Sequence, residues 1–543
     1  MKRLTFALGI VLMLLTCAPH AAAQSNPLEG EWVGGSNLFK NPSFIHFRFN
    51  VLTGQLSGLV DVQNWRMVRR KLSSVRLDAS QLRFEIPSTT GELYVGEGTM
   101  EGDVIRGTLR RGEDQGNFHL LRVKSVNRRT LEAYTGTYTF RNEEQGGKQE
   151  EHLITWGSLY GEHLRWVSLS DGSTTALFPI SENTFLFASS VVNSPVPAAT
   201  WTFEKGEQGK PVRSIVRVTN RPDQIGSRSD LIAQEEVTLH NGDIRLAATL
   251  TAPKTKGPHP AIVFVPGSSD QQTRDESSPF REFEPLIRAG FSILVYDKRG
   301  VGNSTGDWQK ASFDDLAGDA LAAVNYLKRR RDIDTKRIGV WGFSQGGWVA
   351  PLAASRSRTV AFVIMASGGG VTPREAEMNQ QLARMRMRKL SDTEIKEALD
   401  FMKLQFEAVG SERGWEHFQA EVPKVRAAKW YRHTWGGVPK ENWMWAWWRP
   451  LVSYDPAPVL EKVKVPVLAL YGEADTLTVP EAIHASIERI GLALKKGGNT
   501  DFTSRIFPKA SHDLSVFENE RWVAPPDYHS TLVNWLRRVT GRK

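Results

Sequence analysis

At 543 residues the chain is too long for one ordinary domain, and about two to four domains are expected. Apolar residues make up 40% and charged residues 24%, as in ordinary globular proteins. The formal net charge of +9 is spread over short clusters such as Arg69-Arg70-Lys71, which are typical of solvated faces, so we expect no nucleic-acid binding.

The first residues have the pattern of a secretory signal peptide. Lys2 and Arg3 precede an apolar run from Leu4 to Cys17, and Ala21-Ala22-Ala23 offers small residues for cleavage before Gln24. The apolar run is shorter than the ~20 residues that a membrane-spanning helix needs, and no later stretch is long enough. We therefore expect residues 1–23 to be a cleaved signal peptide, an exported protein that is periplasmic or secreted, and no stable membrane span.

Cysteine usage narrows the chemistry further. Cys17 is the only cysteine, so the mature chain has none. This excludes a disulfide framework, a cysteine nucleophile and a thiolate metal site. We expect neither a cofactor nor a bound metal, and the sequence leaves the oligomeric state open.

Residues 25 to about 230 have the pattern of all-β structure. Short alternating segments are separated by glycine-bearing turns such as Thr53-Gly54 and Glu101-Gly102-Asp103. A similar series starts again near Leu131, and the segment from Leu131 opens like the one from Leu28. We predict two small antiparallel modules, barrels or sandwiches, at 24–127 and 128–231. They could bind a polymer, shape the mouth of an active site or pair subunits, or they could be plain packing modules.

The pattern changes after about residue 232. Glu235–Leu239 and Ile244–Thr251 flank the turn Asn241-Gly242, a strong hairpin signal. Continuous apolar strands then alternate with helices, which predicts a mostly parallel sheet covered on both faces. The expected strands are 261–265, 291–296, 337–342, 360–366, 465–471 and 503–507, and the expected helices are 283–289, 313–330, 344–354, one from Pro480, and 527–539.

This alternation stops between residues 371 and 450. The stretch from Glu375 to Val409 is polar and favours helix, which predicts an insertion between two strands of the sheet. The residues after it contain six tryptophans: Trp430, Trp435, Trp443, Trp445, Trp447 and Trp448.

The segment Gly342-Phe343-Ser344-Gln345-Gly346 carries the decisive motif, G-x-S-x-G, between a predicted buried strand and a predicted helix. A sharp strand-to-helix turn crowds the backbone, so small residues are needed two before and two after the serine. The turn presents the serine hydroxyl at the edge of the sheet, near the positive end of the helix dipole. We predict that Ser344 is a nucleophile.

A serine nucleophile needs a base, and in this motif the chain order is serine, then acid, then histidine. Asp475 follows the strand that ends near Tyr471, and His512 follows the strand that ends at Phe507. We therefore predict Asp475 and His512 as acid and base, with Glu473 as the competing acid.

The tetrahedral oxyanion of acyl transfer needs two backbone N–H donors. One is expected from Gln345, the residue after the nucleophile. The other is expected from the loop Pro266-Gly267-Ser268-Ser269, where either Ser268 or Ser269 is the candidate donor.

These residues resemble the α/β-hydrolase superfamily, particularly exported serine esterases and the related serine aminopeptidase-like group, over residues 232–543. The loop at Pro266 with Arg274-Asp275, the segment Tyr296–Gly306, the serine motif and the Asp475 and His512 loops carry the resemblance. It implies that Asp297 and Arg299 are scaffold residues. The chain departs from the family at Pro266, which replaces a histidine and has no N–H to donate, and at Ser269, which replaces a glycine.

The resemblance also implies an α/β-hydrolase fold in which the insertion at 371–450 is a helical cap over the active site. The tryptophans of the cap could line an acyl or aromatic pocket, or they could be the core of the cap. Both readings stay open.

The sequence thus predicts a serine hydrolase that forms an acyl-enzyme and cleaves a carboxylic ester, with a small-molecule or acyl-ester substrate. One alternative keeps the same three residues but cleaves peptides, as an aminopeptidase or acyl-peptidase. Another is a polymer-binding protein with a vestigial hydrolase domain, against which the intact serine, acid and histidine argue.

Overall fold

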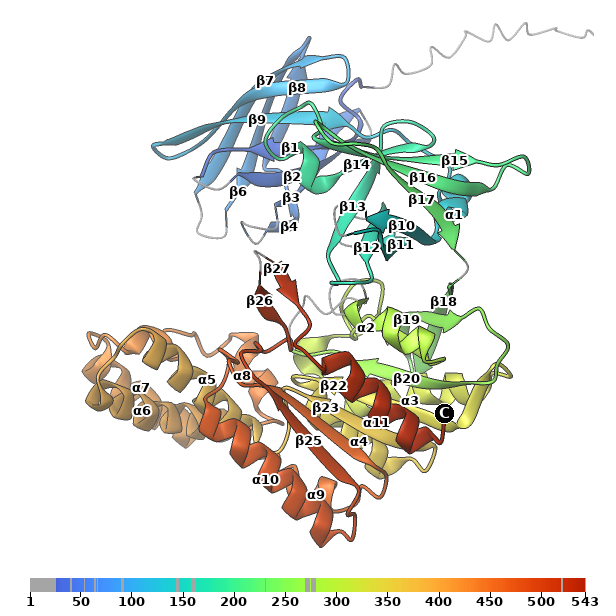
Figure 1. Cartoon of the computed structure of the whole chain (residues 1–543). Coiled ribbons are helices and arrows are strands. Elements are labelled where there is room, and N and C mark those ends of the chain that lie inside the picture. The colour runs from blue at the N-terminus through green and yellow to red at the C-terminus, as the bar shows by residue number, and fades with distance from the viewer. Residues whose placement is uncertain are drawn as a thin grey trace, which may run out of the picture. The chain divides into compact units, whose positions relative to one another are not determined.

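The computed structural model describes residues 26–542 except for 40–41, 53, 63–64, 66, 89–91, 143–145, 158–162, 230, 269–273, 275–279 and 519–520 (Figure 1). The predicted signal peptide, residues 1–23, and the candidate donor Ser269 lie outside the described residues. The chain forms two compact units, with the described residues of Met1–Val123 and Val191–Val196 in one, and those of Lys124–Ser190 and Pro197–Lys543 in the other. The domain boundaries predicted at 127/128 and 231/232 remain a proposal.

The first unit is built on a nine-stranded antiparallel sheet. Its order is β4-β3-β2-β1-β9-β8-β7-β6-β5, so the last strand returns to pair with the first. Alternating side chains such as Trp32, Phe47, Phe49 and Phe84 form its core. The strands are β1 (Gly30–Ser36), β2 (Ser43–Leu52), β3 (Gln55–Val62), β4 (Met67–Lys71), β5 (Ser74–Asp78), β6 (Gln81–Pro87), β7 (Leu93–Glu101), β8 (Val104–Arg111) and β9 (Asp114–Arg122).

The second unit begins with a short helix and a closed eight-stranded barrel in which each strand pairs with the next and β17 closes on β10. Its elements are α1 (Arg128–Tyr134), β10 (Gly136–Asn142), β11 (Lys148–Gly157), β12 (His163–Ser168), β13 (Thr174–Pro179), β14 (Thr184–Phe187), η3 (Ala188–Val191), β15 (Ala199–Lys205), β16 (Pro211–Val218) and β17 (Gln224–Ser229). Tyr134 of α1 stacks on Phe203 of the barrel core at 4.4 Å between ring centroids. The all-β class predicted for the amino-terminal region is confirmed. However, the segment from Leu131 opens with helix α1, whereas the segment from Leu28 leads directly into β1.

The rest of the second unit is an eight-stranded sheet with the order β18-β19-β21-β20-β22-β23-β24-β25. The six strands from β21 to β25 in this order run parallel, and the hairpin β18-β19 adds an antiparallel edge. The strands are β18 (Ile232–Asn241), β19 (Ile244–Pro253), β20 (His259–Val265), β21 (Ser292–Tyr296), β22 (Ile333–Phe343), β23 (Val360–Ala366), β24 (Val467–Gly472) and β25 (Phe502–Phe507).

Helices cover both faces of this sheet, as the continuous apolar strands predict. One core cluster joins the sheet to α3 (Phe313–Lys328), α4 (Gly346–Arg356) and α10 (Pro480–Lys496). The other joins it to α2 (Phe280–Arg288) and α11 (Tyr528–Thr540). Three short elements complete this part: η4 (Trp308–Lys310), α9 (Ala457–Leu460) and the hairpin of β26 (Val516–Glu518) and β27 (Arg521–Val523). This is the α/β-hydrolase fold that the sequence predicts.

The insertion between β23 and β24 is helical, as expected. It contains α5 (Pro373–Met387), α6 (Asp392–Gly410), α7 (Glu412–Val425), η5 (Tyr431–His433) and α8 (Trp443–Trp448). Capping boxes start α5 at Thr372 and α6 at Ser391, and each satisfies backbone donors at the helix start. None of the helices in the described part of the chain is long and apolar enough to cross a bilayer.

Candidate active site

Ser344 occupies a strained turn between β22 and α4. Its φ is 51°, a left-handed conformation that residues with a side chain rarely adopt. A Cβ added to Gly342 would lie 1.9 Å from the Gly346 carbonyl oxygen, and one added to Gly346 would lie 2.4 Å from the Val265 carbonyl oxygen. Both positions therefore require glycine, for the steric reason that the motif suggested.

A chain of hydrogen bonds connects the three predicted site residues. His512 Nε2 lies 3.0 Å from Ser344 Oγ, and His512 Nδ1 lies 2.7 Å from Asp475 Oδ2. The other carboxylate oxygen of Asp475 accepts a hydrogen bond from the Leu477 N–H at 2.7 Å, and the residue is only 7% exposed. The structure thus brings Ser344, His512 and Asp475 together at the carboxyl ends of β22, β24 and β25.

The competing acid, Glu473, does not take part in this chain. Its carboxylate accepts a hydrogen bond from the backbone N–H of Lys509 at 3.1 Å. The acidic neighbour of the histidine, Asp513, is also engaged elsewhere, because it accepts hydrogen bonds from Ser511 and Ser515. Burial alone would raise the pKa of Asp513, but these bonds and the charge of Arg281 lower it. Neither acid competes with Asp475 for the imidazole.

Two backbone N–H groups are available for an oxyanion. Gln345 and Ser268 both line the cavity at Ser344. Among the described residues, neither N–H donates to a protein acceptor. Of the two serines predicted as the second donor, Ser268 is the one within the described residues.

The cavity above Ser344 has a volume of about 180 Å³ and is closed partly by the cap. Trp447 and Trp448 contribute to its wall, together with α5 and α10. Trp448 also packs on Trp435 at 5.2 Å and on Phe406 at 5.5 Å inside the cap. Trp430, Trp435 and Trp445 are buried in the core of the cap, so some of the tryptophans form this core while others line the cavity.

A carboxylate of the cap also lines the cavity. Glu377 lies on α5 and accepts a hydrogen bond from Gln381 Nε2 at 2.9 Å. Burial raises the pKa of this carboxyl, and the hydrogen bond from Gln381 and the charge of Arg384 offset that effect only in part. Glu377 is partly buried, and in its ionised form it could bind a cationic group of a ligand.

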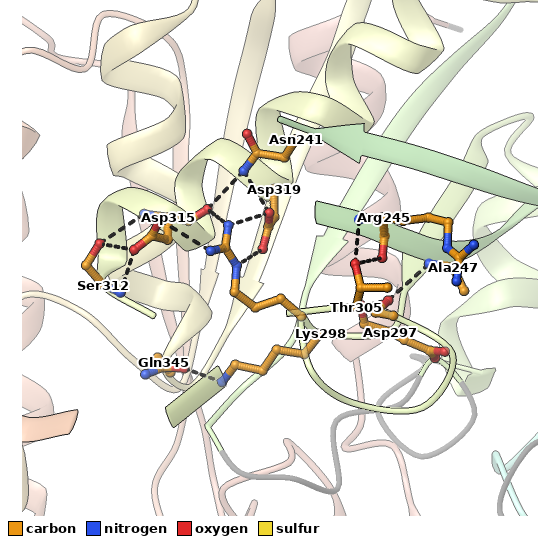
Figure 2. Close-up of polar contacts among 12 residues, drawn as sticks. Asn241, Arg245, Ala247, Asp297, Lys298, Thr305, Ser312, Asp315, Asp319 and Gln345 are labelled. Carbon is orange, nitrogen blue, oxygen red and sulfur yellow. Dashed lines mark hydrogen bonds and ion pairs between the residues drawn. The ribbon is translucent and has the colours of Figure 1, made fainter. Parts of the chain in front are cut away.

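Sequence reasoning missed two further polar residues of the cavity region. Ser367 lines the cavity, and its buried hydroxyl has no hydrogen-bond partner among the described residues. It directly follows β23, so the rule that sites gather at carboxyl ends of parallel strands could have found it. Lys298 follows β21 in the same way. It donates hydrogen bonds to the Gly267 carbonyl oxygen and to Gln345, toward which its side chain extends in Figure 2. No cluster of metal-ligating side chains lies beside Ser344 in the described part of the chain.

Comparisons with known proteins show what this chain is similar to. A family model described as X-Pro dipeptidyl-peptidase (S15 family) matches residues 241–488. The esterase EstD of Thermotoga maritima is 26% identical over 259 residues, which cover 47% of this chain and 54% of EstD. The chain spans about half the length of the curated relatives it matches.

Two solved structures are also similar. An esterase of Pyrococcus furiosus aligns with 57% of this chain and 90% of its own, at 17% identity and a TM-score of 0.35. Est1E of Butyrivibrio proteoclasticus, solved with ferulic acid bound, aligns with 56% of this chain and 97% of its own, at 18% identity and a TM-score of 0.36. The sheet topology is that of the α/β-hydrolase fold, and in sequence the chain is similar to an esterase and to the X-Pro dipeptidyl-peptidase family.

Proposed function

We propose that the protein is an exported serine hydrolase that cleaves carboxylic esters through Ser344, His512 and Asp475. The observation that carries the proposal is the unbroken hydrogen-bond chain from Ser344 Oγ through the imidazole to the Asp475 carboxylate, at 3.0 and 2.7 Å. These distances are those of a nucleophile, its base and the group that orients the base. The esterase EstD among its relatives supports the choice of an ester.

The proposed reaction has two halves. Ser344 Oγ attacks the acyl carbon while His512 Nε2 accepts the hydroxyl proton, and Asp475 stabilises the resulting imidazolium. The N–H groups of Gln345 and Ser268 stabilise the tetrahedral oxyanion. The C–O bond to the leaving group then breaks as His512 donates its proton to the departing alkoxide. Water, deprotonated by His512, then attacks the acyl carbon of the acyl-enzyme. As the acid product leaves, His512 returns the proton to Ser344 Oγ.

Cleavage of peptides is the second candidate, and two observations favour it. Glu377 places a partly buried carboxylate in the cavity, where it could bind the ammonium group of a peptide amino terminus. The family model that matches residues 241–488 is described by a peptidase name. The two candidates share the same nucleophile and differ in the substrate that fits beneath the cap.

A substrate panel separates the two. We expect turnover of p-nitrophenyl acetate, butyrate or octanoate, and little turnover of aminoacyl-anilides. We also expect Glu377→Gln to leave the hydrolysis of these neutral esters unchanged. The ester proposal is wrong, and the peptidase is correct, if the protein cleaves only anilides with a free amino group and not N-acetyl anilides. In that case Glu377→Gln should abolish the preference for the free amino group.

The export of the protein is part of the proposal and rests on the first 23 residues of the sequence. We expect the mature chain to begin at Gln24. Amino-terminal sequencing of the protein from the extracytoplasmic fraction of producing cells checks this, and an intact Met1 in that fraction would contradict it.

A further inference from the structure

We propose that Lys298 is a positioning residue for the oxyanion hole. Its ammonium holds and polarises the Gly267–Ser268 peptide and fixes the Gln345 side chain beside it. The inference rests on the proposed function, because it assigns a role in stabilising the oxyanion of that reaction. It concerns a lysine outside the three residues that perform the proton transfer.

The Lys298 ammonium connects the two strand ends that carry the oxyanion donors. Its Nζ donates a hydrogen bond to the Gly267 carbonyl oxygen at 3.0 Å and another to Gln345 Oε1 at 2.6 Å. In Figure 2 the Lys298 side chain extends toward Gln345. Both Lys298 and Gln345 are buried, at 2% and 5% exposed, so these bonds are shielded from water.

The first of these bonds orients an oxyanion donor directly. The Gly267 carbonyl and the Ser268 N–H belong to one planar trans peptide, so they point in opposite directions. With the carbonyl held on Lys298, the Ser268 N–H is turned away from the lysine. Because Gly267 has no Cβ, its backbone can adopt more conformations than that of other residues. The lysine therefore selects one of the orientations that this glycine allows.

The same bond strengthens the donor. A cation on a carbonyl oxygen draws electron density from the whole peptide unit, so the N–H at its other end becomes a better donor. The effect grows when a negative charge develops on the substrate oxygen. Lys298 should therefore stabilise the transition state more than the bound substrate.

The neighbours of Lys298 in sequence keep its backbone in place. The Asp297 carboxylate accepts hydrogen bonds from Arg274, at 2.6 Å from Nη1, and from the Asn303 N–H at 2.9 Å. The Arg299 guanidinium donates two hydrogen bonds to Asp319, each 2.7 Å long. The lysine is thus presented from a loop that is anchored on both sides.

The ammonium of Lys298 has no carboxylate as a direct partner in the described part of the chain. Among the described residues it forms no ion pair, and the Trp308 ring lies 5.7 Å from Nζ. Burial lowers the pKa of Lys298 to about 7, although the more distant charge of Asp319 opposes this shift. The positive charge is therefore present below that pH and is lost as the pH rises through it.

Lys298→Met tests the role, because methionine fills a similar volume without charge or donor. We expect kcat for a p-nitrophenyl ester to fall by about 100-fold with KM little changed, as for loss of an oxyanion donor. An alkyl trifluoromethyl ketone, which adds to Ser344 as an oxyanion, should lose affinity in parallel with kcat. Lys310→Met is the matched control, since Lys310 is exposed (83% of its side chain) and forms a surface ion pair with Asp307 at 3.1 Å.

A merely structural lysine gives a different result. Lys298→Met would then be less stable to heat and label less with a fluorophosphonate, because less of it is folded. If its folded fraction keeps the wild-type kcat and ketone affinity, the inference is wrong. Gln345→Ala provides a second route, because it removes the side-chain acceptor and keeps the backbone donor. It should lower kcat less than Lys298→Met, and the double variant should be no worse than Lys298→Met alone.

The pH dependence gives an independent readout. In the wild type we expect kcat/KM to fall as the pH rises through about 7, because the ammonium charge is lost. Lys298→Arg should restore part of the activity and remove this alkaline decline. A decline that persists in both Lys298 variants overturns the inference. A wild type that turns over no ester would instead overturn the proposed function, so the two failures can be told apart.

Discussion

At the scale of single residues, the site follows from a few local rules. The sequence could identify Ser344 because the turn requires its flanking glycines, and a Cβ at Gly342 or Gly346 would clash with the backbone in the way the motif implies. Asp475 and His512 could be found because each follows a parallel strand in the expected order. Lys298 also follows a parallel strand, but its contact with Gly267 could not be found, because it joins residues 31 positions apart through tertiary structure alone.

The assignment of the acid gives a residue-scale prediction. Asp475→Asn should lower kcat by about 10⁴-fold, because the amide stabilises the wrong imidazole tautomer and cannot stabilise the imidazolium. Glu473→Gln is the control, since Glu473 contacts Lys509 rather than the histidine. Ester hydrolysis by the purified variants measures both. Equal losses in the two variants would mean that the acid is misassigned.

At the scale of elements, strands were easier to predict than the roles of aromatic side chains. The strand expected at 261–265 is β20 (His259–Val265), because a buried parallel strand has a continuous apolar sequence. The segment from Leu131 was less predictable, since its resemblance to the segment from Leu28 conceals helix α1. The tryptophans of the cap have no clear period, so the sequence could not say which ones face the cavity.

The cap yields an element-scale prediction. Trp447 lines the cavity, whereas Trp443, on the same helix, is 42% exposed and packs against Trp308 at 5.0 Å. Trp447→Ala should enlarge the pocket and shift the preferred acyl chain toward longer esters, with the larger change in KM. Trp443→Ala should leave that preference unchanged. Comparing kcat and KM across acetate, butyrate and octanoate esters measures the shift, and identical profiles would contradict it.

At the scale of the whole molecule, the three site residues all come from one of the two compact units. Within that unit, Leu153 and Val167 of the barrel share a hydrophobic cluster with Phe280 and Phe283 of α2. The sequence could predict two β modules before the hydrolase, because their turns and alternation are local. The sequence could not predict this shared cluster. The alternation of apolar and polar residues along a strand shows which face is buried but not which element covers that face.

Truncation gives a whole-molecule prediction. A chain of residues 124–543 should keep ester hydrolysis, because it keeps the site and the barrel. A chain of residues 232–543 should keep the chemistry but unfold more easily, since exposing Phe280 and Phe283 costs about 1.5–3 kcal/mol for each side chain. Thermal unfolding and initial rates measure the two effects. Equal stability of the two truncated chains would show that the barrel contact contributes nothing.

The most direct test of the central claim is covalent labelling with a fluorophosphonate, followed by peptide mass spectrometry. A serine activated by His512 should react, so we predict one phosphonyl group per chain, on the peptide that contains Ser344. Ser344→Ala should take up no label and hydrolyse no p-nitrophenyl ester, although its fold is intact. Labelling at another residue, or full activity of Ser344→Ala, would contradict the account.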